Sequence, residues 1–222
     1  MLLVLWDIDG TLVDSAGHGR HAFEEAFAEV VGGEPEWVEY AGRTDHQIAL
    51  EMLNDSDEHL PAMLEQLAVK LAAREDLIAA EGRVYPGVPD VLAALHGTDG
   101  VVQSLLTGNV AANAAVKVGA FGLDRWLDLD AGAYGSDPHE RRSDLVAVAR
   151  ERAATRYGQT TGAVLVGDTP LDVQAAREAG ARAVAVATGF ADPDALRESE
   201  PDALLQDLSD TEASIRAITG AT

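Results

Sequence analysis

Two aspartates stand directly behind a short apolar stretch at the start of the chain. Residues 2–6 read LLVLW, and they are followed by Asp7 and Asp9 and then by Gly10 and Thr11. Burying two carboxylates at the end of a strand costs several kcal/mol unless something compensates their charge. A turn with two capping aspartates would explain the pair by local structure alone. A bound cation and an anionic substrate would explain it by chemistry.

Two later apolar stretches also end in small or acidic polar residues. Thr107, Gly108 and Asn109 end the first, and Asp168 and Asp172 follow the second. Because ligands of parallel α/β sheets bind where the carboxyl ends of the strands meet, we expect the three ends to come together. Carboxylates in one pocket repel each other, and a hard divalent cation resolves that repulsion. The pattern therefore predicts a Mg²⁺ site with four candidate ligands: Asp7, Asp9, Asp168 and Asp172.

The spacing of apolar residues predicts the elements that would position these side chains. The continuous apolar run over 2–6 is typical of a strand that is buried on both faces. A helical block follows, with helices predicted over 20–31, 46–53 and 61–80. Strands and helices then alternate: strands over 101–109, 163–169 and 182–189, a short strand-like segment over 126–132, helices over 88–97, 110–122, 143–158 and 170–180, and a mostly helical tail over 192–218. The alternation predicts an α/β fold, with a parallel sheet between two helical layers and the helical block inserted after the first strand.

The amino-acid composition limits the kinds of molecule that the protein is expected to bind. The chain has 222 residues, of which 47% are hydrophobic, and 38 acidic against 16 basic residues give it a net charge of −22. Such acidity argues against nucleic-acid and membrane partners, and any anionic substrate needs a local positive site. The sequence has no Cys, no apolar run of the roughly 20 residues that cross a membrane, and no secretory signal at its start. We therefore expect a soluble, cytoplasmic protein, either a monomer or a homodimer.

The sequence motifs DIDGT, LLTGN and GDTPLD, in that order, resemble those of the haloacid dehalogenase-like superfamily of phosphohydrolases. Three such motifs at matching strand ends are far more specific than the first one alone, and the resemblance covers the whole chain. The segment AGRTDHQIAL and the position of the helical block most resemble those of the phosphoglycolate-phosphatase-like branch. The resemblance implies a three-layered Rossmann-like core over 1–15 and 83–222 and an inserted all-helical cap domain over 16–82. It also implies a Mg²⁺-dependent phosphomonoesterase that acts on a small phosphorylated metabolite.

The resemblance assigns catalytic roles to the first two motifs. Asp7 would be the nucleophile that forms an aspartyl-phosphate, and Asp9 would be the general acid and then the general base. Thr107 would donate a hydrogen bond to a phosphoryl oxygen, with backbone N–H groups at the following helix start assisting it. Gly108 would permit close approach of the phosphate, and Asn109 would cap the helix or touch the phosphate.

The remaining assigned residues bind metal or substrate. Mg²⁺ would be held by Asp7, the backbone carbonyl of Asp9 and Asp168, with Asp172 either a further ligand or a group behind the ligands. The substrate would be bordered by Gly10 and Thr11. In the cap, two explanations stand side by side for Arg43, Thr44 and Asp45. They would contact the far end of the substrate, or they form a turn and an N-cap for the next helix.

One departure from the family concerns its usual Lys, which precedes the helix before the third motif. That region reads YGSDPHERRSDLV here and contains no Lys. Lys117 is one candidate to replace it, because it lies about 12 Å along the helix that starts at Asn109 and its side chain leans toward the helix start. Arg142, or its neighbour Arg141, is the other. We favour Lys117 for the phosphate, with Arg142 in support.

Several other activities are compatible with parts of this pattern. Phosphoglycolate is the favoured substrate by resemblance only. A sugar phosphomutase shares the same core and the same Asp pair, and would transfer the phosphoryl group between two sugar positions. A haloacid dehalogenase fits the Asp9 and Mg²⁺ pattern poorly. A catalytically weak binding protein is favoured only by the missing Lys, and intact Asp7, Asp9 and Asp168 argue against it.

Overall fold

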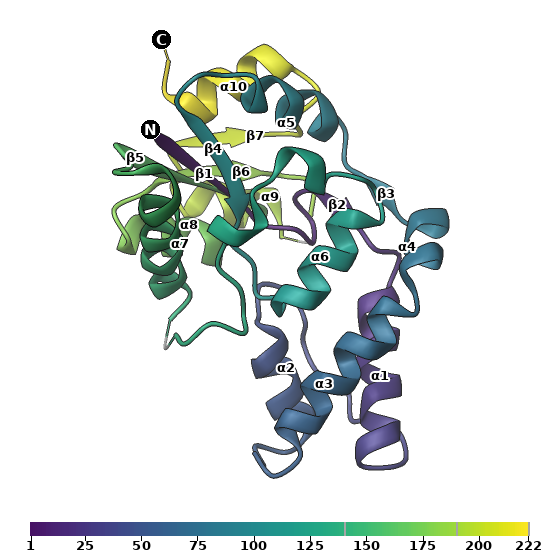
Figure 1. The fold of residues 1–222 in the computed structure, drawn as a ribbon. Coiled ribbons are helices and arrows are strands. Elements are labelled where there is room, and N and C mark those ends of the chain that lie inside the picture. The colour runs from purple at the N-terminus through teal and green to yellow at the C-terminus, as the bar shows by residue number, and fades with distance from the viewer. Residues whose placement is uncertain (140, 190, 222) are drawn as a thin grey trace.

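A five-stranded parallel sheet forms the centre of the molecule (Figure 1). The computed structural model describes residues 1–139, 141–189 and 191–221. In spatial order the strands are β4 (Val101–Leu105), β1 (Leu2–Trp6), β5 (Gly162–Gly167), β6 (Arg182–Val186) and β7 (Ala203–Leu205). Each neighbouring pair runs parallel, so all five carboxyl ends lie at one edge of the sheet. The predicted parallel α/β architecture is confirmed.

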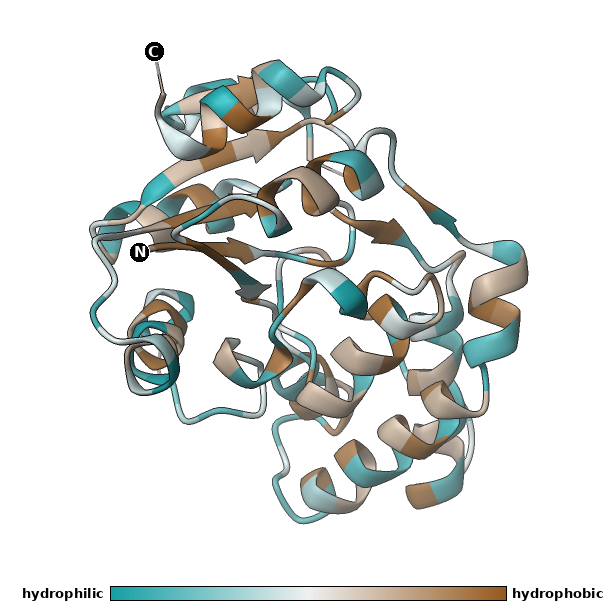
Figure 2. Cartoon of the chain, turned by 45° about the horizontal axis from the view of Figure 1, so that its top comes forward, coloured by the Kyte–Doolittle hydropathy of each residue, from teal (hydrophilic) through white to brown (hydrophobic). Residues whose placement is uncertain are grey.

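Helices cover both faces of the sheet, because successive side chains of a strand point to opposite faces. Val4 and Trp6 pack with one layer, which consists of α5 (Val88–His96), α6 (Ala111–Gly119) and α10 (Thr211–Thr219). Leu3 and Leu5 pack with the other, which consists of α7 (Arg142–Tyr157), α8 (Pro170–Glu178) and α9 (Pro193–Glu198). All four side chains are fully buried. Figure 2 shows the hydrophobic strands between their helical layers.

A helical cap is inserted after the first strand and has an apolar core of its own, which includes Phe23, Met63 and Leu67. It contains α1 (His18–Val30), α2 (Asp45–Met52), α3 (Leu60–Ala72) and α4 (Glu75–Glu81). The chain enters and leaves it through an antiparallel pair of short strands, β2 (Val13–Asp14) and β3 (Arg83–Val84). The predicted division at residues 15/16 and 82/83 falls at this strand pair and stays a prediction.

Several predicted elements were wrong in detail. The helix over 61–80 is two helices, α3 and α4, separated by Ala73 and Arg74. Neither Gly nor Pro marks that break. It is held instead by Arg74, whose guanidinium contacts the His18 ring at 3.2 Å and pairs with Glu25. A break that depends on contacts with a distant helix leaves no trace in the local periodicity.

The strand-like segment over 126–132 is not a strand. It lies in two 3₁₀ helices, η1 (Asp124–Trp126) and η2 (Leu129–Ala131). The Asp128 carboxylate accepts a hydrogen bond from the backbone N–H of Asp130 and so caps the second of them. Such local side-chain bonds compete with strand pairing.

The tail and the strand ends also differ from the prediction. The tail contains a strand, β7, between α9 and α10, and this strand pairs with β6. Its three residues are too few to show a period of their own. Strands β4, β5 and β6 end at Leu105, Gly167 and Val186, so the polar residues predicted as strand ends lie in the loops that follow. Within the described ranges, no helix is long and apolar enough to cross a membrane.

Candidate active site

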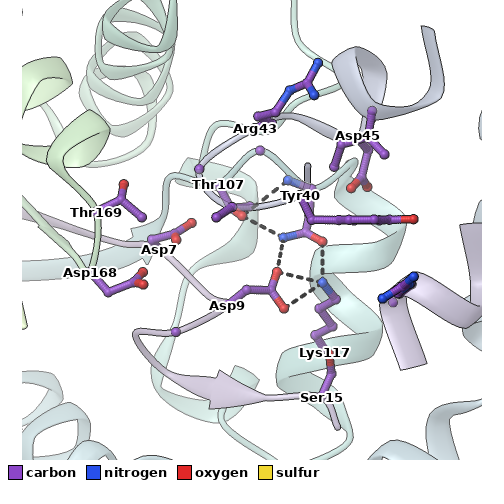
Figure 3. A pocket seen from close by; sticks show the side chains of 18 of the residues that line it. Asp7, Asp9, Ser15, Tyr40, Arg43, Asp45, Thr107, Lys117, Asp168 and Thr169 are labelled. Carbon is purple, nitrogen blue, oxygen red and sulfur yellow. Dashed lines mark hydrogen bonds and ion pairs between the residues drawn. The ribbon is translucent and has the colours of Figure 1, made fainter. Parts of the chain in front are cut away.

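A cavity of about 390 Å³ lies at the carboxyl edge of the sheet, between the core and the cap. Core loops and the cap segment 39–45 both border it (Figure 3). Ten of the predicted site residues line it: Asp7, Asp9, Gly10, Arg43, Thr107, Gly108, Asn109, Lys117, Arg142 and Asp168. Thr11, Thr44 and Asp172 lie directly behind these residues, as their contacts below show. The structure therefore brings the three sequence motifs together.

Three carboxylates form a tight acidic cluster in this cavity. Asp7, Asp168 and Asp172 each place one oxygen within 4.8 Å of the others, and all three are buried. Burial raises the pKa of Asp7 above its ordinary range, although the Arg142 guanidinium opposes the rise. Burial and the charge of Asp7 together raise the pKa of Asp168. A hard cation would relieve both effects, because it adds positive charge where one guanidinium faces three carboxylates.

Arg142 is the cation that faces the predicted nucleophile. It is the first residue of α7, and its Nη2 lies 3.2 Å from Asp7 Oδ1 and 2.6 Å from Asp172 Oδ1. Its neighbour Arg141 is exposed and lies near Asp144 and Glu178 instead. Of the two arginines that stand where the family has its Lys, only Arg142 therefore lies in the cavity.

Both carboxylate oxygens of Asp172 accept hydrogen bonds from protein groups. Its Oδ1 accepts from Arg142 Nε at 3.0 Å, and its Oδ2 accepts from the N–H and the hydroxyl of Thr169 at 3.1 and 2.6 Å. The bond from the Thr169 N–H and a return bond from the Asp172 N–H to the Thr169 hydroxyl, at 3.3 Å, form a capping box at the start of α8. Of the two roles left open by the sequence, this geometry fits a group behind the ligands, which orients Arg142.

Lys117 faces Asp9 rather than Asp7. Its Nζ donates to both oxygens of Asp9 at 2.8 and 2.6 Å and to Asn109 Oδ1 at 2.7 Å. Asn109 Nδ2 donates in turn to Asp9 Oδ2 and to Thr107 Oγ1, each at 2.8 Å. As Figure 3 shows, Asp9 turns toward Lys117 while Asp7 lies beside Asp168. The two aspartates of the first motif thus point to different partners.

Gly10 and Thr11 hold Asp168 in place. The Thr11 hydroxyl donates to Asp168 Oδ1 at 3.1 Å. Gly10 has a φ of +84°, and a Cβ atom on it would lie 2.3 Å from Asp168 Oδ2. Only glycine fits this backbone conformation and this close approach. The hydroxyl of Thr11, predicted to border the substrate, is therefore committed to a carboxylate of the acidic cluster.

The predicted cap residues divide between the two explanations that the sequence left open. The Thr44 hydroxyl accepts from the Gln47 N–H and the Thr44 N–H donates to the Gln47 side chain, both at 3.1 Å, which is a capping box for α2. Arg43 borders the cavity, and its guanidinium pairs with Glu51 of α2, which does not line the cavity. Thr44 is thus an N-cap, and of these two residues Arg43 is the one that lines the cavity.

Sequence reasoning missed some residues of the site. The Thr188 hydroxyl donates to the backbone carbonyl of Gly10 at 2.6 Å, and a Cβ atom on Gly189 would lie 1.6 Å from Asp168 Oδ2. Thr188 and Gly189 both follow β6. Small or polar residues directly after an apolar strand are the same pattern that marked the other three strand ends. Tyr40 also borders the cavity, with its ring edge-on to Phe23 at 5.6 Å. Nothing in the local sequence marks Tyr40.

The raised pKa of Asp45 predicts that the stability of the wild type and that of Asp45→Asn depend differently on pH. Burial raises its pKa from 3.8 to about 6, against the opposing effects of Lys117 and of the donors Val110 and Asn113. Between these two pH values the folded protein binds more protons than the unfolded one, so the wild type loses stability as pH rises through the window. Asp45→Asn removes this titration. As the pH rises from about 4 to about 7, we expect the free energy of unfolding of the variant to rise relative to that of the wild type, by up to about 3 kcal/mol.

Urea unfolding of both proteins across this range measures the difference. Titrating groups that do not interact with Asp45 cancel in the comparison. A gap between the two free energies of unfolding that does not change with pH would contradict the raised pKa.

Comparison with known proteins identifies the family. A family model for haloacid dehalogenase-like hydrolases matches residues 1–180. The chain is 30% identical to the protein described as "Probable phosphatase IndB" of Dickeya dadantii, with 97% of this chain and 94% of that protein covered. It is 27% identical to a phosphoglycolate phosphatase of Mesorhizobium japonicum, with 91% and 89% covered. A solved hydrolase from Pseudomonas syringae shares the fold at a TM-score of 0.73 and 20% identity, over 98% of this chain and 99% of that one.

These matches agree with the resemblance that the three motifs indicated, and they confirm the predicted enzyme class. The chain belongs to the haloacid dehalogenase-like hydrolases, as a phosphatase of their phosphoglycolate-phosphatase-like branch.

Proposed function

We propose that the protein hydrolyses the phosphate monoester of a small metabolite through an aspartyl-phosphate on Asp7. The observation that carries this proposal is the meeting of Asp7, Asp168 and Arg142 within one buried cluster beside a second carboxylate, Asp9. A nucleophilic carboxylate and a separate acid–base carboxylate are what the two halves of such a reaction need. We place the enzyme in the cytoplasm.

The acidic cluster fits a Mg²⁺ ion. Asp7 and Asp168 are buried and their pKa values are raised, so their charge is incompletely compensated by the protein. We propose that these two carboxylates and the backbone carbonyl of Asp9 hold the ion, with Asp172 orienting Arg142 behind them. When bound, Mg²⁺ would neutralise the charge that keeps a carboxylate nucleophile away from a phosphate anion.

The residues of the chain then divide the chemistry between them. A carboxylate oxygen of Asp7 attacks phosphorus, and the leaving oxygen takes a proton from Asp9 as the ester bond breaks. In the second half, Asp9 takes a proton from water, whose oxygen attacks phosphorus and releases inorganic phosphate and free Asp7. Lys117 and Asn109 hold the Asp9 side chain, and Thr107 with the N–H groups behind it binds the phosphoryl oxygens.

The cap would select the leaving group. The cavity is small, and Arg43 and Tyr40 border its cap side, so a small phosphorylated metabolite fits and a polymer does not. Phosphoglycolate is the first candidate, because relatives over nearly the whole chain carry that activity in their names. The number of subunits stays a prediction, a monomer or a homodimer.

A panel of phosphorylated metabolites tests this proposal. We expect phosphate release from at least one of them, and we expect a chelator to remove the activity and added Mg²⁺ to restore it. Inorganic phosphate is measured with and without EDTA, and a matched panel of phosphodiesters is the control. Undiminished release after exhaustive chelation would contradict the metal site. Interconversion of sugar phosphate isomers without release would instead identify a phosphomutase.

A further inference from the structure

A buried carboxylate of the cap contacts the core beside the cavity. Asp45 is the first residue of α2, and its side chain is almost fully buried. Its Oδ2 accepts from the backbone N–H of Val110 and from Asn113 Nδ2, both at 2.8 Å. Its own backbone N–H donates to the carbonyl of Gly108 at 2.8 Å. Two hydrogen bonds therefore join one cap residue to the start of α6, and a third joins it to the loop before that helix.

These bonds supply a cap that helix α6 lacks locally. The N-cap residue of α6 is Val110, whose apolar side chain makes no capping hydrogen bond. The free N–H groups and the positive end of the helix dipole stabilise an anionic side chain at a helix N-terminus, and here they partly offset the cost of burying the Asp45 carboxylate. Lys117, further along the same helix, adds a second favourable charge for the Asp45 carboxylate. The cap domain thus completes a helix of the core.

The backbones around this contact are packed closely. A Cβ atom on Gly108 would lie 2.3 Å from the carbonyl oxygen of Arg43, so the cap chain passes directly over the phosphate-binding loop. Gly42, with a φ of +69°, approaches Leu171 in the same way, since a Cβ atom there would lie 2.8 Å from Leu171 Cδ1. The cap segment 40–45 therefore contacts the core at Gly42, Arg43 and Asp45, on the carboxyl side of Tyr40.

We propose that Asp45 is a positioning residue that docks the cap segment 40–45 onto the 107–109 loop and so holds the substrate cavity in its binding-competent form. This inference rests on the proposed function, because the cavity and the loop are those of the phosphatase reaction. Asp45 acts through its neighbours: it fixes Arg43 and Tyr40 over the cavity, and it fixes the start of the helix that carries Lys117.

The proposal predicts a particular kinetic signature. If docking is weakened, the competent form is a smaller fraction of the free enzyme, and the apparent affinity falls by that fraction. Bound substrate restores the docked form, so turnover at saturation is retained. Asp45→Ala is expected to raise KM by about tenfold while kcat stays within about threefold. A mutation that merely lost folded protein would lower kcat and leave KM unchanged.

Two variants and one non-kinetic measurement make the test specific. Asp45→Asn keeps an oxygen that can accept from Val110, so it is expected to restore the wild-type KM. Asp57→Ala removes an exposed aspartate of the same cap and is the matched control, with wild-type KM and kcat. Hydrogen exchange of the Val110 amide in the substrate-free enzyme is expected to be faster in Asp45→Ala than in the wild type and in Asp45→Asn.

The outcomes separate this inference from the proposed function. Unchanged KM in Asp45→Ala, a fall in kcat alone, or an Asn variant as impaired as the Ala variant would overturn the positioning role. If the wild type releases no phosphate from any substrate, the proposed function fails. The exchange of the Val110 amide then still decides whether Asp45 docks the cap, and equal rates in all variants would refute it.

Discussion

Asp7→Asn is expected to lower phosphate release by about 10³-fold or more, because the amide cannot attack phosphorus. The variant should nevertheless fold. Asp7 is buried and its pKa is raised, so its charge costs the metal-free protein stability. Removing that charge should leave the free energy of unfolding unchanged or higher. Steady-state phosphate release and urea unfolding of the same preparation measure the two effects.

A control and a direct observation complete this test. Asp90→Asn changes an exposed aspartate of α5 by the same chemistry and is expected to retain full activity. Acid quenching of the wild type during turnover, followed by mass spectrometry of the first tryptic peptide, should find a phosphoryl group that Asp7→Asn lacks. Substantial release by the Asn variant would rule out Asp7 as the nucleophile.

Arg142→Ala is expected to have the second largest effect, on activity and stability together. Its guanidinium lies between the carboxylates of Asp7 and Asp172, and its side chain is largely buried. Removing one partner leaves buried carboxylates without compensation, at a cost of about 3 kcal/mol. The nucleophile also loses the cation that offsets its repulsion from phosphate. We expect kcat/KM to fall by about 10²-fold or more.

Two further variants separate charge from geometry at this position. Arg142→Lys keeps the charge but cannot bind Asp172 through two nitrogens, so its activity should lie between those of the wild type and Arg142→Ala. Arg141→Ala removes the exposed neighbour, whose surface ion pairs contribute at most about 1 kcal/mol, and should behave like the wild type. Equal losses in the Ala variants of Arg141 and Arg142 would contradict the assignment.

The sequence by itself was sufficient to predict the class of fold and the meeting of the three motifs at one edge of the sheet. Four of the five strands of the sheet, β1, β4, β5 and β6, coincide with runs of apolar residues, and a loop that carries site residues directly follows each of the four. Parallel strands bring such ends to one edge whatever the intervening chain does. Asp7, Thr107 and Asp168 could therefore be grouped without coordinates, although many residues separate them along the chain.

The tertiary structure alone decided which partners the charged side chains face. The sequence offered Lys117 and Arg142 as cations, with Lys117 favoured for the phosphate, but the structure places Arg142 on Asp7 and Lys117 on Asp9. The contact of Asp45 with the start of α6 was equally invisible, as was the break in the helix around Arg74. Local periodicity fixes which residues share a strand or a helix face. The direction of one side chain toward another depends on how distant elements pack, and only the assembled fold determines that.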